Sequence, residues 1–197
     1  MSYSQYGEDE IIAKLLSPYT GRLLDVGAWY PKTFSNSRLL IEAGWEALLV
    51  EFSPKPVREL VEEYRNNPRV KVLQAAVTTG DSGMTQFDVT DDGLSTCTPE
   101  IRTKWEAEGG YYGKLWVAQL SLERLLMQFG GGFPFVSFDT EGTSVELAIH
   151  YLRDREQRPY VMCVEHDERL VELMSVAQIL GYRAAHLNGT NVILSRI

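Results

Sequence analysis

The chain has 197 residues, which is enough for one domain with a hydrophobic core and too few for two domains of ordinary size. Its hydrophobic share of 44% and its charged share of 23% are typical of a folded globular protein and argue against disorder. The net charge of −8, with no run of basic residues, argues against a nucleic-acid partner, because such a partner requires clustered Lys and Arg.

The chain also lacks several targeting and cross-linking signals. Its first ten residues have neither the basic nor the apolar block of a secretory signal. No apolar run approaches the roughly 20 residues that span a bilayer. Two cysteines, Cys97 and Cys163, cannot make a disulfide framework or a zinc site on their own. We therefore expect a cytoplasmic protein without a membrane span.

Strand-like and helix-like segments alternate along the first part of the chain. Apolar runs predict strands at residues 22–27, 47–51 and 70–77. Between them, the spacing of apolar residues predicts helices at 37–43 and around 57–64. Such alternation predicts a largely parallel sheet.

Residues 78–120 interrupt this alternation with clustered glycines and aromatic residues. We expect a hairpin and an excursion over the sheet edge, within a single domain that spans residues 1–197. The segment contains Trp105, Tyr111, Tyr112 and Trp116. These rings either stack on a sugar acceptor or pack the insert onto the sheet. On the first interpretation, the insert forms part of the acceptor site.

The alternation resumes after residue 120. The predicted helices lie at 122–129, 144–152 and 168–180, and the predicted strands at 133–139, 160–165, 182–187 and 190–196. Asn188-Gly189 separates the last two strands and is a strong hairpin signal. We therefore predict an α/β fold, with a Rossmann-like, doubly wound sheet of about seven strands. The sheet should be mostly parallel with an antiparallel C-terminal hairpin, the usual arrangement of Rossmann-like methyltransferases.

Acidic residues recur where the predicted parallel strands end. In doubly wound sheets, ligands bind outside these carboxyl ends. The residues at this edge are Asp25 with Gly27 and Ala28, Glu51, Ala75 to Val77 (including Ala76), Asp139 with Glu141, and Glu165 with His166. The alternative interpretation is that the acidic residues only cap the helices that follow.

The turn after the first strand favours one class of cofactor. It contains one glycine, Gly27, where a dinucleotide fingerprint needs three, and Trp29 and Tyr30 would obstruct a pyrophosphate. S-adenosylmethionine needs a small residue at the turn and an acidic group for its ammonium, which Gly27 and Asp25 supply. Glu51, 24 residues after Gly27, can accept hydrogen bonds from both ribose hydroxyls.

A series of short motifs occurs in order along nearly the whole chain. They are Ser4–Asp9, Asp25–Ala28, Phe34–Ser37, Gly44-Trp45, Val50-Glu51, Ser95-Thr96, Phe138–Gly142, Val164–His166 and Asn191–Arg196. In these motifs the chain resembles the FkbM family of methyltransferases. The resemblance implies S-adenosylmethionine as the cofactor and O-methylation of a sugar or natural-product hydroxyl.

The resemblance also implies roles for individual residues. The cofactor site would be lined by Gln5, Asp25, Gly27, Ser35, Asn36 and Glu51, while Asp139 and Glu141 would face the transferred methyl group. The chain departs from the family pattern at Ser144, where the family often has a further acidic residue. The acceptor or its activation therefore differs here if that acidic residue binds or activates it.

Methyl transfer to a hydroxyl requires a group that removes the hydroxyl proton, and Asp139, Glu141 and His166 are the candidates. His166 alternatively faces water before the next helix, with Asp167 as that helix's N-cap. Asp139, Glu141, Glu165 and His166 could instead converge on Mg²⁺ or Mn²⁺, although we expect no metal.

Three rival functions remain open at this point. A nicotinamide-dependent oxidoreductase could use a related sheet, and a non-catalytic module could bind the cofactor without turnover. A methyltransferase of large acceptors would need the insert or a dimer for recognition. The expected acceptor is otherwise a small molecule or carbohydrate.

Overall fold

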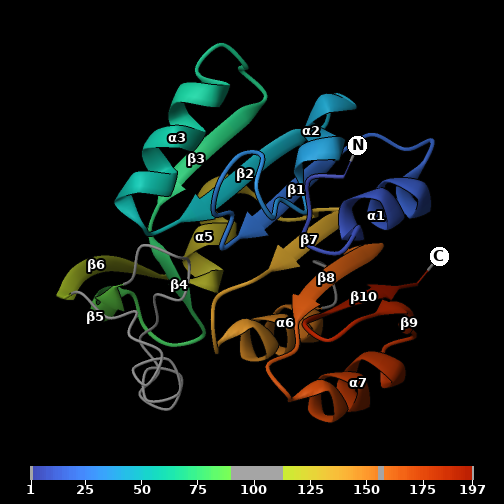
Figure 1. Cartoon of the computed structure of the whole chain (residues 1–197). Helices are drawn as coiled ribbons and strands as arrows, with labels where there is room; N and C mark the ends of the chain where they lie inside the picture. The colour runs from blue at the N-terminus through green and yellow to red at the C-terminus, as the bar shows by residue number, and fades with distance from the viewer. Residues whose placement is uncertain (1, 90–112, 155–157, 197) are drawn as a thin grey trace.

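The computed structural model describes residues 2–89, 113–154 and 158–196, and a seven-stranded sheet forms its centre (Figure 1). The strands are β1 (Arg22–Val26), β2 (Glu46–Glu51), β3 (Val70–Gln74), β7 (Phe135–Phe138), β8 (Val161–Glu165), β9 (Arg183–Leu187) and β10 (Asn191–Ser195). Their order is β3-β2-β1-β7-β8-β10-β9, and the first five are parallel. β10 is antiparallel to both of its neighbours. The predicted fold class, including the C-terminal hairpin, is confirmed.

Helices cover both faces of this sheet (Figure 1). One face packs against α1 (Glu8–Leu16), α2 (Arg38–Glu42) and α3 (Pro54–Tyr64), and the other against α5 (Leu122–Phe129), α6 (Ser144–Arg153) and α7 (Leu170–Ile179). Successive strand residues alternate between the two cores, because side chains of a strand point to opposite faces. Leu23 therefore packs with α1 and α2, whereas Leu24 packs with α5 and α6. None of the described helices is long and apolar enough to cross a membrane.

A smaller sheet contains β4 (Ala76–Thr78), β5 (Gly83–Val89) and β6 (Gly113–Ser121), in the order β4-β6-β5. β5 and β6 are antiparallel, as predicted for the hairpin. The prediction of a single strand at 70–77 is wrong, because the chain changes sheets at Ala75. The backbone N–H of Ala75 still donates to the carbonyl of Glu51, but the next three residues pair with β6 instead of β2.

The described N-terminal segment, for which the sequence predicted no element, contains α1. Predicted and observed ends differ slightly elsewhere, and α7 begins at Leu170 rather than Glu168. Asp167 and Glu168 both have positive φ angles, of 45° and 60°, which a right-handed helix excludes. The N-cap of α7 is accordingly Arg169, and the prediction of Asp167 in this role is wrong.

Candidate functional site

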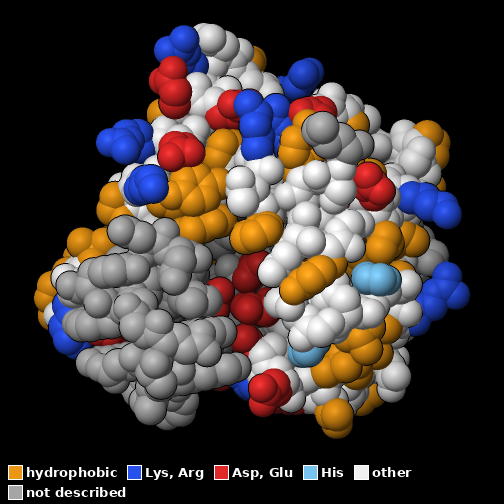
Figure 2. All heavy atoms as spheres, viewed as in Figure 1, with side chains coloured by type: hydrophobic (Ala, Val, Ile, Leu, Met, Phe, Trp, Pro, Cys, Tyr) orange, Lys and Arg blue, Asp and Glu red, His pale blue; other side chains and the backbone are white. Residues whose placement is uncertain are grey.

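A cavity of about 300 Å³ opens at the carboxyl ends of β1, β2, β7 and β8. β1 and β7 are neighbours in the sheet although the chain visits β2 and β3 between them, so the strand order reverses at this point. Ligands of doubly wound sheets bind at such a crevice. Acidic side chains are gathered in the hollow of this face (Figure 2). Among the described lining residues these are Glu51, Asp139, Glu141, Glu146 and Glu165.

Gly27 lies in the floor of the cavity, where the carboxyl ends of the neighbouring strands β1 and β7 meet. It has a φ of +84°, and its N–H donates to the carbonyl oxygen of Val50 at 2.9 Å. A Cβ atom at this position would lie 1.6 Å from the carbonyl oxygen of Asp139. Only glycine therefore permits the two strand ends to approach this closely. The predicted position of Gly27 at the cavity is matched by its place in the lining.

Glu51 lies in the wall formed by the end of β2 and is only 4% exposed. Its Oε2 accepts from the backbone N–H of Trp29 at 3.0 Å, and its Oε1 from that of Ser53 at 2.7 Å. Burial raises the pKa of Glu51, and these backbone hydrogen bonds oppose the rise. Next to it, Phe52 stacks on Phe87 of β5 with ring centroids 4.1 Å apart. A hydrogen-bond acceptor thus adjoins an aromatic wall.

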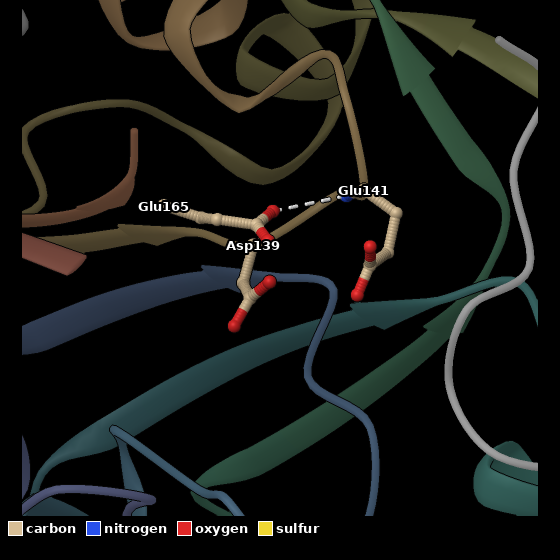
Figure 3. Close-up of side chains that lie close together, drawn as sticks. All are labelled: Asp139, Glu141 and Glu165. Atoms are coloured by element: carbon tan, nitrogen blue, oxygen red, sulfur yellow. Dashed lines mark hydrogen bonds between the residues drawn. The ribbon is translucent and has the colours of Figure 1, made fainter. Parts of the chain in front are cut away.

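Asp139, Glu141 and Glu165 form a carboxyl cluster, with one oxygen atom from each within 4.8 Å of the others (Figure 3). Oε2 of Glu165 accepts from the backbone N–H of Glu141 at 3.2 Å and from Oγ of Ser144 at 3.3 Å. Figure 3 shows the carboxyl groups of Asp139 and Glu141 directed to the same side. Ser144, the departure from the family pattern, therefore helps to hold Glu165.

Two carboxyls of the cluster retain protons more strongly than usual. Burial, together with the negative charges of Asp25 and Asp167, raises the pKa of Asp139 to about 7, although a hydrogen bond with Glu165 opposes the rise. Burial, followed by the charges of Asp139 and Glu141, raises the pKa of Glu165 well above its ordinary value. Adjacent carboxylates cannot all ionise at low cost, so the cluster favours a shared proton in the hydrogen bond between Glu165 and Asp139.

His166 does not join this cluster. Its Nε2 lies 3.2 Å from the carbonyl oxygen of Asn188 in the β9–β10 turn, and His166 is not among the residues that line the cavity. The structure thus does not bring together the predicted metal set of Asp139, Glu165 and His166. The oxygens that do converge would suit Mg²⁺ or Mn²⁺, but a shared proton also lowers the charge of the cluster.

Of the other predicted cofactor residues, two line the cavity and four lie behind it. Gln5 and Ala76 are in the lining. The four are Asp25, Ala28, Ser35 and Asn36, and all are buried. The pKa of Asp25 is raised to about 6, because burial outweighs the lowering effect of its hydrogen bonds with Ser37 and Ser137. Nδ2 of Asn36 donates to Oγ of Ser137 at 3.4 Å, so Asn36 and Asp25 belong to a buried polar layer around Ser137.

Sequence reasoning singled out only part of the wall residue by residue. It named no individual lining residue of segment 78–120, although it placed that segment at the acceptor site, and these residues are Thr78, Thr79, Thr85, Phe87 and Gln119. The lining residues outside that segment to which it gave no role include Phe34, Phe52, Thr143 and Thr190. Thr78 and Thr79 directly follow a predicted strand, and the rule that ligands bind outside the carboxyl ends of strands could have identified them. Within the described ranges, the non-glycine residues with positive φ are Trp29, Phe34, Glu141, Asp167 and Glu168, all in loops after β1, β7 or β8. Such strained conformations cluster at functional sites.

Neither a scan against models of protein families nor a search of curated proteins finds a match to the chain. Solved structures do match. Methyltransferase FkbM from Methylobacillus flagellatus KT has a TM-score of 0.56 at 11% identity, over 89% of this chain and 43% of that protein. The METTL16 MTase domain has a TM-score of 0.54 at 12% identity, over 97% of this chain and 67% of that domain.

Precorrin-6y C5,15-methyltransferase from Geobacter metallireducens GS-15 matches over 98% of this chain and 90% of its own length, with a TM-score of 0.52 at 11% identity. The chain spans less than half of the FkbM structure, and more of the other two. At these identities the comparisons establish the fold. The chain has a Rossmann-like fold that is similar to those of solved methyltransferases.

Proposed function

We propose that the protein is an S-adenosylmethionine-dependent O-methyltransferase that acts on a hydroxyl of a sugar or small natural product. The observation that carries the proposal is the cavity at the carboxyl ends of β1 and β7, with Glu51 on one wall and Asp139 on another. The similarity of the fold to three solved methyltransferases supports it. The resemblance of the motifs to the FkbM family points the same way.

The cofactor would occupy the β1–β2 side of the cavity. Glu51 accepts from the backbone N–H groups of Trp29 and Ser53, and it has further hydrogen bonds with the backbone of Phe52 and the side chain of Ser53. The two ribose hydroxyls would compete for the lone pairs of this carboxylate, while the neighbouring Phe52 ring offers a flat apolar face to the adenine. Among the described lining residues there is no Lys, Arg or His, which disfavours the pyrophosphate of a nicotinamide cofactor.

Asp139 is the group that we assign to proton removal. Methyl transfer is an in-line displacement: the acceptor oxygen forms a bond to the methyl carbon as the carbon–sulfur bond breaks. Deprotonated Asp139 accepts the hydroxyl proton, and neutral S-adenosylhomocysteine leaves. A pKa of about 7 suits this task, because a base works best when its pKa lies near the operating pH. Glu141 adjoins Asp139 in the cluster and would contact the acceptor.

The acceptor would be an uncharged molecule rich in hydroxyl groups. The described lining combines carboxyl groups with six threonine side chains, Thr78, Thr79, Thr85, Thr140, Thr143 and Thr190. β5 and β6 contribute Thr85, Phe87 and Gln119 to the wall, which supports a role of segment 78–120 in the acceptor site. Trp116 is 62% exposed, whereas Trp105, Tyr111 and Tyr112 lie outside the described residues.

The first test is cofactor binding to wild type and to Glu51→Gln by isothermal titration. We expect micromolar binding of S-adenosylmethionine and S-adenosylhomocysteine to wild type, and no binding of NAD⁺. Glu51→Gln should weaken the adenosyl ligands roughly 30-fold, because it removes a charged acceptor from the ribose. Glu46→Gln, at the exposed start of the same strand, is the matched control and should bind normally. A folded wild type that binds neither adenosyl ligand would refute the proposal.

The acceptor assignment predicts a charge preference in turnover. Neutral sugars and their uronic acids can be compared as matched pairs, with formation of S-adenosylhomocysteine as the readout. We expect each neutral sugar to react at least about tenfold faster than its acid, because the acidic cavity repels a carboxylate. Faster methylation of the acids would contradict the assignment. Acceptor-dependent turnover would also exclude a non-catalytic binding module.

A further inference from the structure

Glu8, the first residue of α1, is a fully buried carboxylate. Its Oε1 accepts from Nδ2 of Asn188 at 2.8 Å and from Nδ2 of Asn191 at 3.0 Å. Its Oε2 accepts from the backbone N–H of Tyr6 at 2.8 Å. Burial raises the pKa of Glu8, but these hydrogen bonds outweigh burial and keep the pKa below its ordinary value. The group is therefore charged at neutral pH and held by amide donors.

These hydrogen bonds join two parts of the chain that are about 180 residues apart in sequence. One is the N-terminal segment, in which Gln5 lines the cavity. The other is the β9–β10 turn, in which Thr190 lines the cavity. Oδ1 of Asn188 accepts from the backbone N–H groups of Thr190 and Asn191, at 2.9 and 2.7 Å, so the Asn188 side chain also shapes the turn.

Glu8 does not itself line the cavity. Its burial and its three donors nevertheless connect the wall that carries Gln5 to the wall that carries Thr190. The turn also contacts the end of β8, since the N–H of His166 donates to the carbonyl of Thr190 at 2.9 Å. A single buried carboxylate thus connects the N-terminal segment with the loop that follows Glu165.

We propose that Glu8 is a positioning residue that holds the N-terminal segment against the β9–β10 turn and thereby sets Gln5 and Thr190 in place for ligand binding. This inference rests on the proposed function, because the ligand that reports on it is S-adenosylhomocysteine. It adds a residue that touches no ligand but determines the affinity of the site.

Glu8→Gln is a sharp test because the amide fits the same volume. The amide NH₂ group must replace either Oε1 or Oε2. In the first case it faces the Asn188 amide donor, and in the second it faces the N–H of Tyr6. Each orientation leaves a buried donor without an acceptor, which is costly enough to separate the two segments. We expect the affinity for S-adenosylhomocysteine to fall about tenfold.

The matched control is Tyr182→Phe. This change removes another buried hydrogen bond, from the Tyr182 hydroxyl to the carbonyl of Pro159, at residues that do not line the cavity. Both variants should melt at a lower temperature than wild type, but only Glu8→Gln should bind the ligand more weakly. Hydrogen exchange at the Thr190 and Asn191 amides should also accelerate selectively in Glu8→Gln, which a general loss of stability would not produce.

The outcomes separate the two proposals. If wild type binds S-adenosylhomocysteine and Glu8→Gln binds it equally well, the positioning role is wrong and the proposed function stands. If wild type binds no adenosyl ligand, the proposed function fails and the positioning role fails with it. Should Glu8→Gln not fold, Asn191→Ala removes one donor to Glu8 and must show the same loss of affinity. Unchanged affinity in that variant overturns the inference.

Discussion

Replacing Gly27 with alanine is expected to destabilise the protein by about 4 kcal/mol and to abolish cofactor binding. A Cβ atom at residue 27 would lie 1.6 Å from the carbonyl oxygen of Asp139, a distance that no side chain can occupy. The neighbour is backbone at the end of β7, so relief requires β1 and β7 to move apart. That movement would also shift Asp139, whose N–H donates to the carbonyl of Val26.

Gly44→Ala is the matched control for Gly27→Ala. Gly44 also has a positive φ, of +94°, but nothing lies within 4 Å of its would-be Cβ atom. The Gly44→Ala variant should lose only about 1 kcal/mol of unfolding free energy, because alanine is less stable than glycine in this backbone conformation. Chemical denaturation of both variants, with S-adenosylhomocysteine titration of the folded fractions, provides the measurement. Equal losses of unfolding free energy in the two variants would show that the backbone at Asp139 moves away from the new Cβ atom without destabilising the protein.

Much of the site could be predicted because parallel strands end at one edge. Gly27, Glu51 and Asp139 are far apart in sequence, yet each directly follows or ends a predicted strand, and all three line the cavity. The Asn188-Gly189 turn similarly predicted an antiparallel hairpin from local backbone preference alone. These inferences need only the strand pattern and the rule that ligands bind at carboxyl ends.

The alternation of strand side chains explains why Asp25 is not in the cavity wall. It lies within β1 between Leu24 and Val26, which both face the core of α5 and α6. Asp25 therefore points to the opposite face, next to Ser37 and Ser137. Its position near a strand end could not distinguish this buried layer from the lining.

Tertiary contacts decided the remaining differences. The change of sheet at Ala75 depends on pairing with β6, which lies more than 35 residues later in the chain. His166 follows β8 as predicted, but its ring meets the carbonyl of Asn188 in a turn brought alongside by the hairpin. Neither contact has a local sequence signal.

Asp139→Asn is expected to reduce the rate of methyl transfer roughly 1,000-fold with little change in cofactor affinity. Asparagine preserves the shape of the side chain but cannot accept the hydroxyl proton. In wild type, the rate should rise with pH and level off above a pKa of about 7, because Asp139 must be deprotonated to act. Initial rates of S-adenosylhomocysteine formation between pH 5 and pH 9, with a reactive sugar, measure both effects.

The same variant should be more stable than wild type at alkaline pH. The pKa of Asp139 is raised from about 4 in the unfolded chain to about 7 in the folded protein, so folding favours the protonated form. Its contribution to stability is therefore complete below pH 4 and is lost as the pH rises to about 7. Asparagine is neutral at every pH and avoids this loss, and it removes a charge that raises the pKa of Glu165.

We expect Asp139→Asn to melt about 4 °C above wild type at pH 8, with a smaller difference at pH 5. Asp81→Asn, at an exposed position before β5, should show neither the stabilisation nor the loss of rate. If the variant is slow but does not melt at a higher temperature, ionisation of another carboxyl group, and not of Asp139, destabilises the protein at alkaline pH. A stabilised variant with a normal rate would leave Asp139 strained by its neighbours but assign proton removal to Glu141, because only these two carboxyl groups of the cluster are directed to the same side (Figure 3).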